Sequence, residues 1–413
     1  MAKNFADIYN DVNDSIALEQ KFFIKEEVAG LRGVQVDPVG TDFFFTLTGG
    51  STNFQRPLES SPHRSGRHHT SVIKQKTTTE WSIPTFFNID TGVAAGTSEI
   101  DAAIRVLHKS MFGKEDTTTG VKYTTETVPN TTFTILENGD KWAKQTFGAF
   151  VESAEMSFPG DGQAQTTWGG MAKSSNLIGI GRSSVDNNLG NTLTLETDEG
   201  RRMRVGGHVM IVESDGLTRS ADTPDGSPRI VTAIAGDVIT VDGAALADAD
   251  GSVTPIYLAY YEPETPAAIN EPQVGLEGSI VIAGFSALNC IRSATLNCAN
   301  NHELQDNCFG EEGLGGNLFV PGGRFTAEVS LEINMNESLL ELMNKIRDDI
   351  SGEDVTLILG DASTRHLEIS IPQAIFQLPE IPVPDTGPIP ITFTGNAYQS
   401  GIDAADEISI HYK

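Results

Sequence analysis

The sequence predicts a mainly β protein with two helices, built from two related β-barrel or sandwich domains and a small inserted β-barrel. With 41 Gly and 19 Pro among 413 residues and 38% hydrophobic residues, the composition is typical of a turn-rich β protein. Apolar and polar residues alternate over many short segments, as in half-buried strands. The order strand, long loop, strand, helix and several strands occurs twice.

Two segments have the spacing of amphipathic helices. The first, within 96–113, starts near Ser98 and Asp101, which resemble a capping box; the second starts at Asn336, a favoured N-cap residue. Their apolar positions are Ile100, Ala103, Ile104, Leu107 and Met111 in the first, and Leu339, Leu340, Met343, Ile346 and Ile350 in the second. Each helix should therefore lie across one face of a sheet.

Similar strand candidates flank the two helices. The matching segments are 77–87 with 325–335, 132–172 with 354–397, and 41–50 with 291–300. Aligning Glu80 with Glu328 also pairs Ser82 with Ser330. The shared order of elements predicts a duplicated domain.

We therefore divide the chain into four parts. Residues 21–184 and 275–413 form the two related domains, and residues 1–20 form an N-terminal segment that is either a docking helical arm or a flexible tail. The part between them, 185–265, contains short alternating strands with tight Gly and Asp turns. We expect it to be a small independent β domain on the outside of the protein.

Charge and motif content argue against several classes of function. The net charge of −28, from 28 basic and 56 acidic residues, repels nucleic-acid phosphates, although simple solubility also explains it. An odd number of cysteines, three, argues against a disulfide framework, and alternation places Cys290 and Cys298 on a buried strand face. His63, His68 and His69 lie among basic residues without acidic or thiol ligands. We predict no metal site, no cofactor and no enzymatic activity.

Two long loops carry opposite charge. The loop of the first domain is basic, and the corresponding loop of the second domain is acidic. Their charged residues are Arg56, Arg64, Arg67, Lys74 and Lys76 in the first and Glu303, Asp306, Glu311 and Glu312 in the second. Complementary charges of this kind steer docking between copies of a chain, although both could be ordinary solvated loops.

The strands before the helices have one polar face. In 325–335 the apolar residues alternate with Glu328, Ser330 and Glu332, and Glu80 and Ser82 hold the matching places in the first domain. If these strands line a pore, its wall presents carboxylates and hydroxyls.

The segment KFFIKEEVAGLRGVQVDPVGTDFFFTL (21–47) resembles the opening of major tail tube proteins of long-tailed bacteriophages. The strand, loop and helix order of 21–184 and 275–400 also resembles the tail tube fold, which contractile tails and type VI secretion tubes share. The resemblance implies six-fold rings with a continuous inner β-barrel, external helices, stacking through the long loops and an acidic lumen. A subunit with two tube domains would form a trimer with pseudo-six-fold symmetry.

The resemblance also implies a function. We expect a structural virion protein of the tail, made in the host cytoplasm, which forms stacked trimeric or hexameric rings and conducts genomic DNA without binding it specifically. Its other partners would be the tape measure, tail terminator and distal tail or baseplate proteins, without membrane insertion. Two alternatives stay open, another structural β-rich phage or surface protein (decoration, baseplate or adhesin) and a β-rich hydrolase.

Overall fold

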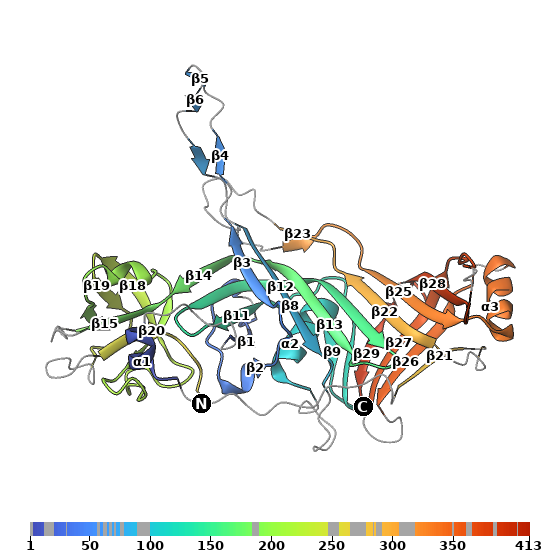
Figure 1. The fold of residues 1–413 in the computed structure, drawn as a ribbon, viewed down its shortest axis with the longest axis horizontal. Coiled ribbons are helices and arrows are strands. Elements are labelled where there is room, and N and C mark those ends of the chain that lie inside the picture. The colour runs from blue at the N-terminus through green and yellow to red at the C-terminus, as the bar shows by residue number, and fades with distance from the viewer. Residues whose placement is uncertain are drawn as a thin grey trace.

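The chain forms a mainly β structure, seen in a computed structural model. The structure describes residues 3–11, 20–29, 31–55, 58–60, 64–65, 68–69, 72–74, 78–88, 100–183, 190–246, 256–264, 278–283, 285, 291–304, 319–348, 351–360, 366–382, 386–402 and 404–413. In Figure 1 the inserted strands lie at one end of an elongated body, and helix α3 (Glu337–Asp348) lies at the other. No helix in the described part of the chain is both long and apolar enough to span a membrane.

The first strand set surrounds one long, bent strand. The set consists of β1 (Lys21–Glu26), β2 (Phe43–Phe44), β3 (Ser51–Gln55), β8 (Thr78–Phe86), β11 (Phe133–Asn138), β12 (Ala143–Pro159), β13 (Gln165–Ala172) and β14 (Ser174–Ile178). One antiparallel series runs in the order β3, β8, β13, β12. The first half of the 17-residue β12 pairs instead with β11 and β14. Strand β12 therefore passes from one sheet of the set to the other.

The second strand set repeats this pairing order. It consists of β21 (Ser279–Ile282), β22 (Ile291–Ala299), β25 (Thr326–Asn334), β26 (Glu353–Gly360), β27 (His366–Phe376), β28 (Pro390–Ala397) and β29 (Ser409–Tyr412). The antiparallel series is β22, β25, β28, β27, and β27 also pairs with β26 and β29. Strand β21 flanks β26 as β1 flanks β11.

The two sets also share their register. Residues that lie side by side across the four strands are Asn53, Glu80, Met171 and Phe150 in the first set and Asn297, Glu328, Asn396 and Ile375 in the second. Glu80 and Glu328 thus hold the same place. The expected match of 41–50 with 291–300 is wrong, because a turn at Thr48 and Gly49 (φ 106°) delays the strand beside β8 to residues 51–55.

A direct strand pairing joins the two sets. The second half of β12 is antiparallel to β22, from Ser153 beside Ala299 to Pro159 beside Ser293. The result is one continuous sheet in the order β3, β8, β13, β12, β22, β25, β28, β27. In the other layer β29 pairs with β10 (Val121–Thr125), which forms a hairpin with β9 (Gly113–Asp116).

Both predicted helices are present and pack by their apolar faces. Helix α2 (Ala102–Phe112) buries Ile104, Leu107 and Met111, and α3 buries Leu339 and Met343. The Asn336 side chain accepts a hydrogen bond from the Leu339 amide (2.8 Å), which confirms the predicted cap.

Three details of the helices differ from the prediction. Helix α2 starts after Asp101, whose side chain makes no capping hydrogen bond, and Ser98 lies outside the described residues. Leu340 is exposed. A third helix, α1 (Phe5–Asn10), lies in the N-terminal segment, capped by the Asn4 side chain.

The inserted strands form a sheet that shares a core with the first strand set. The sheet contains β15 (Ile180–Ser183), β20 (Ile256–Tyr260), β17 (His208–Val212), β18 (Arg229–Ala235), β19 (Val238–Val241) and β16 (Thr192–Thr194), in that order. It starts at Ile180 rather than at 185. Its core includes Phe5 of α1, Phe23 of β1 and Leu136 of β11. The core of the insert is thus separate from the main core of the two strand sets, and α1, β1 and β11 contribute side chains to it, so the insert packs on the rest of the protein.

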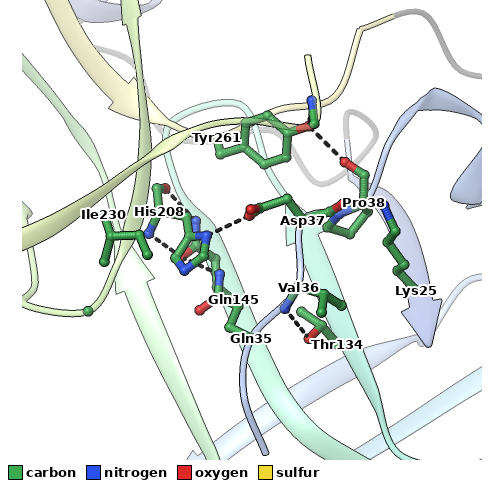
Figure 2. Close-up of polar contacts among 12 residues, drawn as sticks. Lys25, Gln35, Val36, Asp37, Pro38, Thr134, Gln145, His208, Ile230 and Tyr261 are labelled. Carbon is green, nitrogen blue, oxygen red and sulfur yellow. Dashed lines mark hydrogen bonds and ion pairs between the residues drawn. The ribbon is translucent and has the colours of Figure 1, made fainter. Parts of the chain in front are cut away.

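Polar contacts fasten the insert at the same place. Gln145 of β12 accepts a hydrogen bond from the His208 amide (2.8 Å) and donates one to the His208 carbonyl (2.6 Å). Figure 2 shows the His208 ring against Asp37 (2.5 Å) and the Tyr261 hydroxyl donating to the Pro38 carbonyl (2.7 Å). These contacts hold the insert at a defined angle to the sheets.

A buried histidine predicts how stability depends on pH. His108 of α2 stacks on Tyr123 (ring centroids 4.8 Å apart) and bonds to the Tyr412 hydroxyl (2.7 Å), and burial lowers its pKa to about 3. The unfolded imidazole binds a proton below about pH 6.5 and the folded one does not. As the pH falls from 6.5 towards 3, the free energy of unfolding should therefore drop by up to about 1.4 kcal/mol per unit from this group alone.

The variant His108→Gln should lose this part of the pH dependence and keep a partner for Tyr412. Urea unfolding of both proteins at several pH values measures the difference in slope. Equal slopes for the two proteins would contradict the assignment to His108.

Candidate functional site

The continuous sheet has one buried face and one exposed polar face, and the polar face is the candidate site. Trp81, Ile83, Val329 and Leu331 point into the core. The alternate residues of the same strands face the other way, because successive side chains of a strand point to opposite sides. We call this side the polar face; it includes Glu80, Ser82, Ser153, Glu155, Thr167, Ser293, Asn297, Thr326, Glu328, Ser330, Glu332, Thr392, Thr394 and Asn396.

All five residues predicted for a pore wall lie on the polar face. Glu80, Ser82 and Glu328 are exposed, and Ser330 and Glu332 are half-buried. Glu80 and Ser82 belong to β8, and the other three residues belong to β25. Both strands are part of one sheet, because the paired strands β12 and β22 lie between them.

Sequence reasoning missed the residues in the centre of this face. Glu155 of β12 lies beside Asn297 of β22, which lies beside Glu328 of β25, and Asn396 of β28 continues the row. The signal for Glu155 was present, because the polar residues Ser153, Glu155 and Ser157 alternate with buried apolar ones. The pairing of β12 with β22 could not be read from the sequence.

The polar face is acidic. It carries the carboxylates of Glu80, Glu155, Glu328 and Glu332, and Arg292 of β22 forms an ion pair with Glu332 (2.8 Å). An open hollow of about 530 Å³ lies at its centre, and its polar lining includes Ser153, Glu155, Asn297, Thr326, Glu328 and Asn396. Such a wall repels a polyanion and offers hydroxyl and amide groups that hold water.

The described strands of the two predicted charged loops lie at the same edge of the sheet, and the first of them projects from the body (Figure 1). The first is a hairpin of β4 (Leu58–Ser60) with β7 (Val72–Lys74) and β5 (Arg64–Ser65) with β6 (His68–His69); the second contains β23 (His302–Leu304) and β24 (Phe319–Pro321). Arg64 lies in β5, Lys74 in β7 and Glu303 in β23. The other predicted stacking residues, Arg56, Arg67, Lys76, Asp306, Glu311 and Glu312, lie outside the described residues.

The described residues contain no group of three side chains suited to hold a metal ion. Cys298 is buried on the core side of β22, as predicted, and burial raises the pKa of its thiol to about 12. Its thiol is therefore protonated and unreactive at neutral pH. Cys290 lies outside the described residues.

Comparison with known proteins does not assign the chain to a family. No protein-family model matches the chain, and no curated protein is significantly similar to it.

The acidic residues of the polar face should be dispensable for folding. Glu80, Glu155 and Glu328 are exposed, and none of them forms an ion pair with a described residue. Each change to Gln should therefore alter the free energy of unfolding by less than about 0.5 kcal/mol.

Glu27 provides a matched contrast. Its buried carboxylate accepts hydrogen bonds from the amides of Gly33 (2.6 Å) and Gly148 (2.6 Å) and from the Thr132 hydroxyl (2.7 Å). Glu27→Gln should cost about 1–3 kcal/mol in urea unfolding. Similar costs at Glu80 and Glu27 would show that the polar face has a structural role.

Proposed function

We propose that the protein is the subunit of a hollow tube and that the polar face lines its bore, as in the tail tube of a long-tailed bacteriophage. The observation that carries the proposal is the recurrence of one strand order and register in two sets that already pair edge to edge. We interpret the two sets as two copies of one domain within a structural virion protein that has no enzymatic activity.

Ring closure follows from this geometry. Within one chain the last strand of the first set, β12, pairs with the first strand of the second set, β22. If a second chain joined the first by the same edge-to-edge pairing, its β3 would lie next to β27 of the first chain. Because one chain supplies two equivalent units, three chains would close a pseudo-six-fold ring. Such closure covers strand edges that otherwise promote aggregation.

The acidic polar face would suit the passage of DNA. A bore lined by carboxylates and hydroxyls repels phosphates, so that a duplex would move through without binding. The apolar face and helices α2 and α3 would then lie on the outer side of the sheet, together with the insert. The charged loops on one edge of the sheet would contact the next ring, and the ends of the tube would contact other tail proteins.

The insert favours a second candidate function. A rigidly fastened extra domain is also expected of a decoration, baseplate or adhesin protein, which would not need to form a tube. Negative-stain electron microscopy of concentrated protein separates the two. Stacked rings with a central hole would support the tube subunit, and isolated solid particles would support the second candidate.

Charge reversal on the polar face should make assembled tubes retain DNA. In Glu80→Lys/Glu155→Lys/Glu328→Lys, the bore would gain positive charges that bind phosphates, with a strong dependence on salt. Retention of short duplex DNA on sedimented tubes measures the effect, and the wild-type tubes should retain none.

A matched control carries the same charge change on other elements. The variant Glu213→Lys/Glu264→Lys/Glu341→Lys alters exposed residues of the insert and of α3. Its tubes should bind DNA on the outside only, where nuclease removes it. Equal nuclease protection by both variants, or no retention by the first, would contradict a polar bore.

A further inference from the structure

Two side chains cover the free edge of β3. The Thr52 amide donates a hydrogen bond to the Glu137 carboxylate (3.1 Å), and the Thr52 carbonyl accepts one from the Lys144 ammonium (2.9 Å). Both backbone groups thus point away from β8. We call Glu137 and Lys144 the clasp.

The equivalent edge of β22 is paired with a strand. Leu296 of the second set is equivalent to Thr52 of the first. Thr52 lies beside Trp81, the residue after Glu80, and Leu296 lies beside Val329, the residue after Glu328. Leu296 lies beside Met156 of β12.

The hydrogen-bond pattern at this junction gives the direction of the Leu296 backbone. The Asn300 amide donates to the Glu152 carbonyl and the Gly160 amide to the Arg292 carbonyl, each at 2.9 Å. Since bonded pairs alternate along an antiparallel ladder, Leu296 must direct its N–H and C=O to Met156. The clasp therefore gives Thr52 the acceptor and the donor that a neighbouring strand gives Leu296.

The opposite end of the sheet has an uncovered edge. Strand β12 has a bulge between Val151 and Ser153, so we count from the pairs beyond it, Ser153 beside Gly169 and Gln377 beside Thr394. This count places Leu378 at the position of Ala154, Pro379 at that of Glu155 and Glu380 at that of Met156. Ala154 is buried beneath β22, whereas Leu378 is 54% exposed. The Gln377 amide donates to the Thr394 carbonyl (2.9 Å), so this segment continues alongside β28, and no strand of the described residues pairs with its other side.

The residues that face this edge with their backbone are Leu378 and Glu380. Gln377 directs its N–H to β28, and alternate residues of an extended strand point to opposite neighbours, so Leu378 and Glu380 direct theirs to the open side. Exposed Leu378 (54%) and Ile381 would lose contact with water if a strand lay beside them.

We propose that the clasp is a removable cap and that the partner of β3 is residues 377–381 of a second copy of this chain. On assembly this segment displaces the clasp from Thr52 and pairs with β3 in the register of β12 with β22. The inference rests on the proposed function, in which copies of the chain join edge to edge.

The exchange leaves no buried charge without a partner. Glu137 keeps its hydrogen bond from the side-chain amide of Gln20 (2.6 Å) and its ion pair with Lys144 (3.3 Å). Thr52 exchanges its bonds to the clasp for bonds to the Glu380 backbone, so the number of backbone hydrogen bonds stays balanced. The gain comes from the burial of Leu378 and Ile381.

Cysteine cross-linking tests the register. Asn297 lies beside Glu155 within the chain, so Asn53 of one copy should lie beside Pro379 of the next, in a non-hydrogen-bonded pair with Cα atoms about 4.5 Å apart. That spacing suits a disulfide. Assembled Asn53→Cys/Pro379→Cys should give intermolecular disulfides under mild oxidation.

The control Asn53→Cys/Thr392→Cys places the second cysteine on β28, one strand further in. It should give no cross-link above the background of the wild-type cysteines. Absence of cross-links in the assembled test variant, or equal cross-linking in both variants, would overturn the proposed register.

Weakening the clasp tests its role as a cap. Glu137→Gln should lower the protein concentration at which assembly begins, by about fivefold, because the bond from Thr52 loses its charged acceptor. Glu27→Gln removes a carboxylate of similar burial that does not contact β3. It should leave that concentration unchanged or raise it. A threshold for Glu137→Gln that equals the wild-type value, or rises as in Glu27→Gln, would refute the cap.

The outcomes distinguish this inference from the proposed function. Hollow tubes without the cross-link would refute the register and leave the tube subunit in place. Cross-linked assemblies without a central hole would confirm the edge pairing and refute the tube.

Discussion

The pairing of β12 with β22 is the constraint on which the rest of the structure depends. It places two strand sets of the same order in one sheet, with their polar residues on one side and their apolar residues on the other. Without it Met156 and Leu296 would be exposed at two sheet edges. Because this pairing occurs inside one chain, it also serves as a template for how a further chain could be added, with β3 and the end of β27 as the two remaining edges.

The same sheet explains why acidic residues collect on one surface. The buried side is covered by helices α2 and α3 and by the second layer of strands, so charge is excluded from it. Carboxylates on the open side, such as Glu155 and Glu328, keep access to solvent and pay no desolvation cost. Glu155 and Glu328 form no ion pair with a described residue, which is why we propose that they act on a passing polyanion and not on the fold. The buried carboxylates, Glu27 and Glu137, are instead surrounded by hydrogen-bond donors.

Local patterns predicted the local structure well. Alternation placed Glu80, Glu328 and Cys298 on the faces they occupy, and helical spacing located α2 and α3. The same patterns could not show which strands pair, so Glu155 went unnoticed, and the strand beside β8 was placed too early. The shared core of the insert and the clasp were equally hidden, because Phe5 packs on strands distant in sequence and Thr52 meets Glu137 85 residues further along. Such contacts depend on tertiary packing, which no periodicity records.

The most direct test of the account is a density map of the assembled protein by electron cryo-microscopy. The account predicts a hollow cylinder in which Glu80, Glu155 and Glu328 face the bore, with α2 and α3 on the outer side of the wall. A map in which those three residues face outwards, or in which the polar face is buried against another chain, would contradict it.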